Sequence, residues 1–237
     1  MENNEKNLQN EVNTEQNVSN VKKNDKKKTI VLVVIIIAIL LVLGFWGYSV
    51  FKKYNDKTEQ KEVANNFTTN VTKGNKIENT ADYSNAVNPY DSIQTVAPAG
   101  TNSTQTYKGF IMVGRIEIPK TKVDLPVLAE VTKKSIETSV AVLYGPGLNK
   151  VGNTVIVGHN YRNGTFFSDN AKITNGDKIY ITDTDGNRVT YIVYNTYTTT
   201  PEDADYYTRD THGAMEISLS TCTDDSQGRI IIWARAE

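Results

Sequence analysis

The sequence predicts an all-β domain of short strands, a barrel or a sandwich, preceded by a single transmembrane helix. About seven or eight short, alternating, β-branched runs fill roughly the last 130 residues. An uncharged apolar run of about 22 residues, the length a helix needs to cross a bilayer, precedes them. The 237 residues are 38% hydrophobic and 22% charged, with a net charge of -1. The sequence therefore has no excess of basic residues that would indicate a nucleic-acid partner.

The apolar run extends from Ile30 to Phe51, and we assign residues 29–51 to the membrane helix. Lysines are concentrated before it, whereas mixed charge follows Lys52 and Lys53. This asymmetry predicts a cytoplasmic N-terminus and an extracellular C-terminal part. A cleaved signal peptide is disfavoured, because the run is longer than a signal core and no small-x-small site follows it. The lysines that precede the run are Lys22, Lys23, Lys26, Lys27 and Lys28.

The segments on either side of the membrane helix are polar. Residues 1–28 are rich in Asn, Glu, Gln and Lys, and we predict a disordered cytoplasmic tail. In residues 52–107 the apolar residues look single and aperiodic, which favours an extracellular stalk or linker that could include a short helix near the membrane. The folded domain is expected at residues 108–237.

The strand-like runs of the folded domain follow in order. "FIMVGRIEIP", "VDLPVL" and "NTVIVGHN" come first, and helical signals are limited to "KKSIETSV" and "TFFSDNA". "DKIYITDTDGNRVTYIVYNTYT" then forms two alternating runs around Asp185-Gly186, the strongest hairpin signal in the chain. "MEISLSTC" and "RIIIWARA" end the domain. So many short strands in one core-sized segment predict one β domain.

Cys222 is the single cysteine and therefore forms no internal disulfide. Outside the membrane such a thiol is buried and inert, paired with another chain, or reactive. A reactive thiol must ionise, which requires positive charge nearby. Cys222 ends one predicted strand and Arg229 starts the next, so a hairpin would bring them together. Arg229 could hold an oxyanion, although a solvated arginine at a strand end fits the same pattern.

The chain has two histidines, His159 and His212. A histidine beside Cys222 could supply positive charge and later protonate a leaving amine. His159 closes the run "TVIVGHN" and could reach Cys222 only through the fold. His212 lies in a polar segment, and we interpret it as a surface residue.

The motifs "SLSTC" followed by "GRIII", with "VGHN" upstream and "GRIEIPKTKVDLPV" at the start, closely resemble those of the sortases, the membrane-anchored cysteine transpeptidases of Gram-positive surfaces. The resemblance covers residues 109–236. It implies an eight-stranded sortase β-barrel in which Cys222 is the nucleophile, His159 its partner and general acid, and Arg229 the group that binds substrate and oxyanion. Ser218 stands where the family motif has Thr. The resemblance also implies that Thr221, Ser220 and Asn160 contact substrate.

The same resemblance implies the reaction and its partners. The enzyme would cleave an LPXTG-like sorting signal of a secreted surface protein between Thr and Gly and join that protein to a cell-wall amine, such as the lipid II cross-bridge. It implies no metal or organic cofactor and no nucleic-acid partner. A single-pass protein of the cell membrane with an extracellular catalytic domain is consistent with this chemistry.

Some features leave alternatives open. "GHNYRNGTFF" is similar to class B sortases, whereas "IPKTKVDLPV" is similar to class D. Asn88, Pro89 and Tyr90 resemble the Asp-Pro-aromatic lid of pilus-building sortases, with Asn in place of Asp. A pilin-polymerising sortase is therefore one alternative. A non-enzymatic, membrane-tethered β-domain that binds a partner and buries its thiol is the other.

Overall fold

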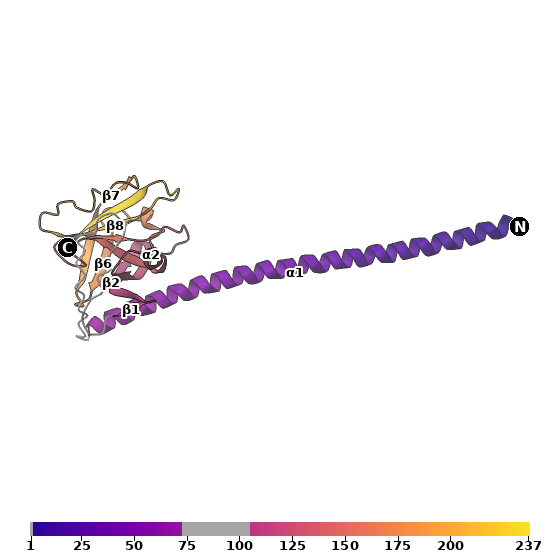
Figure 1. Cartoon of the computed structure of the whole chain (residues 1–237), viewed down its shortest axis with the longest axis horizontal. Helices are drawn as coiled ribbons and strands as arrows, with labels where there is room; N and C mark the ends of the chain where they lie inside the picture. The colour runs from indigo at the N-terminus through magenta and orange to yellow at the C-terminus, as the bar shows by residue number, and fades with distance from the viewer. Residues whose placement is uncertain (1, 73–104) are drawn as a thin grey trace. The chain divides into compact units, whose positions relative to one another are not determined.

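A computed structural model of the chain describes residues 2–72 and 105–237, with side chains from residue 31 onward. The chain divides into two compact units, residues 1–56 and 57–237. The long helix α1 (Glu2–Thr72) contributes to both units (Figure 1).

The first unit contains the apolar part of α1. Within the described residues, α1 is the one helix long and apolar enough to cross a membrane, over Val31–Val71. Its apolar side chains between Val31 and Phe51 are exposed and do not pack in a protein core, as expected of a membrane anchor. The helix also includes residues 2–28, for which we predicted disorder, and residues 2–43 contain neither glycine nor proline to interrupt it.

The second unit is built on eight longer strands and one short one. Its elements after α1 are β1 (Thr106–Tyr107), β2 (Phe110–Ile118), β3 (Val123–Leu128), α2 (Lys133–Thr138), β4 (Val140–Tyr144), β5 (Gly152–Val157), β6 (Lys178–Asp183), β7 (Arg188–Thr199), β8 (Met215–Cys222) and β9 (Arg229–Ala236), with 3-10 turns η1 (Pro119–Thr121) and η2 (Asn170–Lys172). The expected hairpin around Asp185-Gly186 joins β6 to β7.

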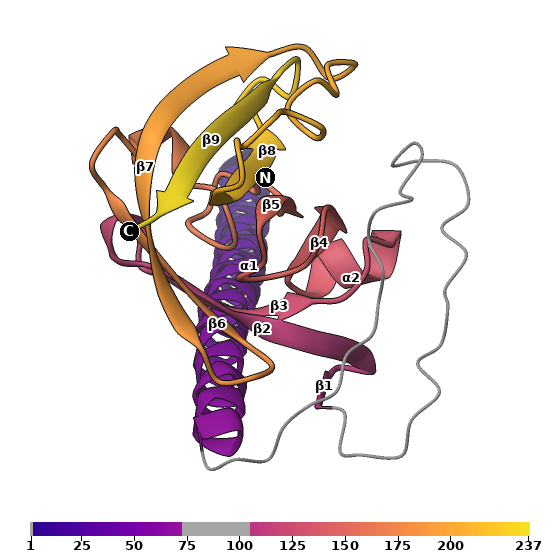
Figure 2. The same ribbon diagram turned by 90° about the vertical axis from the view of Figure 1, so that its left-hand side faces the viewer.

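The sheet closes into a barrel. The strands follow the order β1-β2-β3-β4-β5-β8-β9-β7-β6, and β6 also pairs with β2, which completes a ring of eight strands (Figure 2). Most neighbours are antiparallel, whereas β3–β4 and β5–β8 are parallel. The predicted all-β, eight-stranded barrel is therefore confirmed, and a barrel replaces the sandwich that the strand pattern alone left open.

The two faces of the sheet carry separate apolar clusters, because side chains alternate along a strand. Ile217 and Leu219 of β8 point into the barrel with Ile156 and Ile232. Residues of the opposite parity on β5 and β9 belong to a second cluster on the outer face. This outer cluster comprises Leu143, Val155, Tyr206 and Ile231, with Tyr144, Val157, Tyr197, Tyr207, Trp233 and Val131 partly buried against it.

The end of α1 packs on the barrel, where we predicted a linker without apolar periodicity. Ala64, Phe67 and Val71 are buried at spacings of three and four residues, which places them on one face of the helix. Phe67 and Val71 contact Met112, Leu128 and other residues of strands β2 to β4. Residues 57–72 are therefore a packed part of the second unit, whereas the division of the whole chain into domains stays a prediction.

Candidate functional site

Cys222, Arg229 and His159 come from three neighbouring strands at one end of the barrel. Cys222, the last residue of β8, pairs directly with Arg229, the first residue of β9. On the other side of β8, the parallel pairing with β5 ends at Val157 opposite Ser220. His159 and Cys222 each lie two residues beyond that pair. Three segments far apart in sequence thus bring the three predicted residues to the same level of the sheet.

Cys222 lies on the outer face of the barrel. Because Ile217 and Leu219 point inward, alternation places Ser218, Ser220 and Cys222 on the opposite face. Side chains of directly opposed residues in antiparallel strands lie on the same face, so Arg229 shares it. Both residues are partly exposed.

Gly158 fixes the backbone immediately before His159. A Cβ atom there would lie 2.7 Å from Val140 Cγ1 and 2.9 Å from Phe167 Cδ2. The strand end passes too close to its neighbours for any side chain. Thr221 Oγ1 donates a hydrogen bond to the Gly158 carbonyl at 2.7 Å. A hydrogen bond therefore joins Gly158, the residue before His159, to Thr221, the residue before Cys222.

The loops that follow His159 and Cys222 are joined by Asn160. Its Nδ2 donates to the Cys222 carbonyl oxygen at 3.0 Å and to Asp224 Oδ1 at 2.8 Å. Its Oδ1 accepts the backbone N–H of Arg162 at 3.0 Å. Arg162 Nη2 in turn donates to Ser226 Oγ at 2.6 Å. Both loops therefore form one bonded unit.

The three residues predicted to contact substrate are engaged inside the protein. Both ends of the Asn160 amide bond the adjacent loops, and Thr221 bonds Gly158. Ser220 Oγ accepts a hydrogen bond from Tyr206 Oη at 3.0 Å, and Thr221 and Ser220 are buried. In this structure these side chains support the backbone around Cys222.

His159 is half-buried beside an aromatic ring. The His159 and Tyr161 ring centroids lie 4.9 Å apart. Burial lowers the pKa of His159 below its ordinary value, because it disfavours the imidazolium; the carboxylate of Glu137 on α2 opposes this shift. The neutral imidazole is therefore the favoured form at neutral pH.

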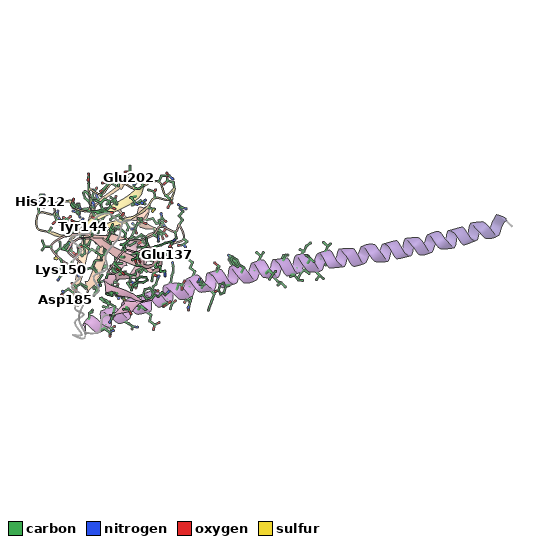
Figure 3. The ribbon with its side chains drawn as sticks, in the orientation of Figure 1. Glu137, Tyr144, Lys150, Asp185, Glu202 and His212 are labelled. Carbon is green, nitrogen blue, oxygen red and sulfur yellow. The ribbon has the colours of Figure 1, made fainter. Side chains whose placement is uncertain are left out.

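His212 lies at the periphery of the barrel (Figure 3). Its side chain is 82% exposed, and Nδ1 lies 2.9 Å from Asp210 Oδ2. The exposure agrees with our interpretation of His212 as a surface residue. The motif that resembles a lid, Asn88, Pro89 and Tyr90, lies outside the described residues.

Aromatic side chains extend along the outer face near Cys222, a feature that the sequence analysis did not identify. Tyr144 and Tyr207 stack with centroids 5.9 Å apart, and Tyr197 meets Trp233 edge to face at 5.2 Å. The sequence signal that could have identified this feature is the position of Tyr197 in β7 and of Trp233 in β9, on the outward-facing side of each alternating strand. Within the described residues, no three or more His, Cys, Asp or Glu side chains gather where they could bind a metal ion.

Comparisons with known proteins identify the family of the domain. The Sortase domain family matches residues 116–237. The chain is 34% identical to Sortase A of Bacillus anthracis over 124 residues, which cover 51% of this chain and 58% of that protein. It therefore spans less than two thirds of the length of that relative.

A solved sortase structure shares the fold. Sortase A of Corynebacterium diphtheriae, a lid mutant, aligns with a TM-score of 0.50 and 27% identity, over 54% of this chain and 71% of that chain. A Sortase D5 transpeptidase of Clostridium perfringens aligns with a TM-score of 0.49 and 24% identity, over 54% and 79%. With its barrel, the pairing of Cys222 with Arg229 and the match over residues 116–237, the chain belongs to the sortase family.

Proposed function

We propose that the chain is a membrane-anchored cysteine transpeptidase in which Cys222 is the nucleophile, His159 the general acid and base, and Arg229 the oxyanion-binding group. The observation that carries this proposal is the pairing of Cys222 with Arg229, with His159 two residues past the end of the neighbouring parallel strand. A thiol, an imidazole and a guanidinium at one level of a sheet are the groups that acyl transfer needs.

In the first step, the Cys222 thiol gives its proton to the neutral His159 imidazole, and the resulting thiolate attacks the carbonyl carbon of the Thr-Gly bond in an LPXTG-like sorting signal. The Arg229 guanidinium donates hydrogen bonds to the oxyanion that forms. As the carbon–nitrogen bond breaks, the His159 imidazolium gives its proton to the departing glycine amine. The product is a thioester between Cys222 and the threonine carbonyl.

In the second step, the neutral amine of an acceptor, such as the cross-bridge of lipid II, attacks the thioester carbonyl. The His159 imidazole accepts a proton from the attacking nitrogen. The carbon–sulfur bond then breaks, Cys222 leaves as a thiolate, and the surface protein is joined to the acceptor by an amide bond.

Asn160, Thr221 and Ser220 support this chemistry through the backbone. Their hydrogen bonds to the Cys222 carbonyl, to Gly158 and from Tyr206 fix the loops that present the reacting groups. Geometry held in this way lowers the entropic part of the barrier. We therefore propose a positioning role for these three residues in substrate recognition.

The proposed orientation follows from charge. The lysines before the apolar part of α1 favour a cytoplasmic N-terminus and an extracellular barrel in a Gram-positive cell membrane. Secreted proteins and cell-wall precursors are then on the same side of the membrane as Cys222.

The test uses the full chain in detergent micelles with a quenched library of LPXTG-type peptides, with and without an added amine. We expect cleavage after Thr and an amine-linked product, both lost in Cys222→Ala. The fluorescence of the folded barrel serves as the control for that variant. Cleavage that persists in Cys222→Ala removes the nucleophile assignment.

The same assay separates the alternatives. A pilin-polymerising enzyme would prefer the lysine side chain of a protein acceptor over a cross-bridge peptide. A non-enzymatic binding domain would leave the whole library intact, and Cys222 would not react with a methanethiosulfonate reagent.

A further inference from the structure

The segment that connects β7 to β8, residues 200–214, covers the outer face of β8. Glu216, Ser218, Ser220 and Cys222 alternate along that face. The first three are buried, although they point away from the barrel interior, whereas Cys222 is partly exposed. The 200–214 segment lies against this face and provides side chains that bond each of the three buried residues. The contacts of the segment therefore follow β8 from Glu216 to Ser220, two residues before Cys222.

Glu216 is the strongest of these attachment points. Its side chain has 0% exposure, and its carboxylate accepts hydrogen bonds from Arg209, from Arg235 Nε at 2.6 Å and from Tyr194 Oη at 2.7 Å. Burial favours the neutral acid, but these donors outweigh it and hold the pKa of Glu216 below its ordinary value. Burial and the bond to Glu216 raise the pKa of Tyr194 to about 12, so its hydroxyl remains a donor.

Arg209, the partner from the 200–214 segment, is fixed on several sides. Its side chain is 11% exposed, and Nη2 donates to Asn153 Oδ1 at 3.0 Å. Its guanidinium lies 4.7 Å from the centroid of the Trp233 ring, a favourable cation–π distance. An arginine so enclosed cannot move away without leaving a buried carboxylate short of a donor, which is costly.

Three further hydrogen bonds continue from Asn153, a partner of Arg209, toward the end of β8. Asn153 Nδ2 donates to the carbonyl oxygens of Tyr206 and Tyr207 at 2.8 and 3.1 Å. The Tyr206 hydroxyl reaches Ser220, two residues before Cys222 on the same face. Tyr206 and Tyr207 belong to the aromatic outer cluster. Arg209 and Asn153 therefore join the backbone that carries these two rings to β5 and β8.

We propose that Arg209 and Glu216 are positioning residues that hold the 200–214 segment against β8 and thereby set the peptide-binding surface beside Cys222. The inference rests on the proposed function, because a peptide surface has meaning only if Cys222 acts on a peptide. Neither residue touches the reacting atoms. Their loss should weaken peptide binding and broaden peptide selection, with a smaller effect on the chemical step.

Arg235 provides a matched control. It bonds the same carboxylate, with Nη2 2.6 Å from Glu216 Oε1, but it belongs to β9 and its side chain is 54% exposed. Arg235→Gln removes an ion pair with Glu216 without releasing the 200–214 segment. A purely structural role for Glu216 predicts similar effects of Arg209→Gln and Arg235→Gln, whereas positioning of the segment predicts different ones.

The experiment compares these variants of the full chain in detergent micelles by peptide kinetics and by hydrogen exchange with mass spectrometry. For Arg209→Gln we expect KM to rise at least about tenfold, the loss expected for one buried, charge-assisted hydrogen bond. We expect kcat to change less than KM, and amide exchange to accelerate in residues 201–213 alone. Arg235→Gln should leave KM and that exchange near the wild-type values. Equal effects of the two variants, or unchanged exchange in Arg209→Gln, overturn the inference.

Hydrogen exchange can be measured without enzymatic activity. The proposed function and the positioning role of Arg209 and Glu216 can therefore be tested independently. A wild-type chain that cleaves no peptide overturns the proposed function, and the exchange of residues 201–213 still decides whether Arg209 holds the segment. If Arg209→Gln does not fold, Tyr206→Phe removes only the hydroxyl that bonds Ser220. That variant should change KM and exchange in the same direction by a smaller factor, and wild-type values for both would overturn the inference.

Discussion

Lys57 Nζ donates a hydrogen bond of 2.8 Å to the carbonyl oxygen of Gly164, 107 residues further along the chain. Gly164 lies in the loop that follows His159, so the end of α1 contacts the loop that carries a proposed catalytic group. Gln60 and Thr68 extend the same contact surface: Gln60 Nε2 donates to the Thr138 carbonyl oxygen at 3.3 Å, and Arg115 Nη1 donates to Thr68 Oγ1 at 3.2 Å.

This packing predicts that the barrel depends on the end of α1. Phe67 is fully buried against residues of β2 to β4, so Phe67→Ala should lower the free energy of unfolding by about 3 kcal/mol through lost burial and a cavity. The measurement is denaturant unfolding followed by Trp233 fluorescence in a Trp46→Phe background. Lys61→Ala, at an exposed position of the same helix, is the control. Equal midpoints for both variants would show that the helix does not stabilise the barrel.

Asn160 should matter through the loops that it joins. Asn160→Ala removes the bonds to the Cys222 carbonyl and to Asp224, and leaves a partly buried carbonyl without its donor. We expect kcat/KM for peptide cleavage to fall about tenfold. Asn163→Ala, in the same loop where Asn163 bonds Thr165, should have a much smaller effect. If Asn160 contacted the substrate directly and were essential for binding, the variant would instead show a far larger rise in KM, with kcat unchanged.

The pKa of His159 should respond to Glu137. Because the folded-state pKa is lowered, the unfolded chain binds more protons near pH 6, so this contribution to stability is full above about pH 6.5 and is lost as the pH falls. Glu137→Gln removes the carboxylate that favours the imidazolium and should lower the pKa of His159 further. NMR titration of the two histidines measures this, with exposed His212 as the internal reference. A higher pKa for His159 in the variant would contradict the assignment.

Arg229 should not be replaceable by lysine. A point charge cannot reproduce the planar fork of donors, so Arg229→Lys should lower kcat for peptide cleavage by about a hundredfold or more. Modification of Cys222 by a methanethiosulfonate reagent should persist, which shows that the thiol remains accessible. Arg188→Lys, at an exposed position at the start of β7, is the control. Near-normal turnover by Arg229→Lys would identify Arg229 as a solvated residue at a strand end.

The strands and the pairing of Cys222 with Arg229 were predictable because both depend on local patterns, whereas closure into a barrel depends on the long-range pairing of β2 with β6. Alternation marks the strands, Asp185-Gly186 marks a hairpin, and a strand that ends at Cys222 before one that starts at Arg229 implies that the two residues are neighbours. The position of His159 depends on a parallel pairing between β5 and β8 that no local signal specifies. It was expected only from the resemblance to sortases.

Other features were missed for physical reasons. The spacing of Ala64, Phe67 and Val71 is helical, but the surrounding Asn- and Thr-rich composition hid it. Asn160 was expected to contact substrate, and its partners at Cys222 and Asp224 are more than sixty residues away. The sequence analysis assigned no role to Glu216, because its bond to Arg209 depends on the path of an irregular segment. Local patterns do not encode such long-range or irregular contacts.

The parallel pairing of β5 with β8 also has a consequence for when the protein can become active. Val157 and Ser220 are paired although the whole β6–β7 hairpin lies between them in sequence, and β9 must insert beside β8 before Arg229 reaches Cys222. Contacts of such long range form late in folding. In the proposed orientation, a chain still emerging across the membrane would therefore carry an unassembled centre. Its proposed nucleophile would meet other secreted polypeptides before it could cleave them.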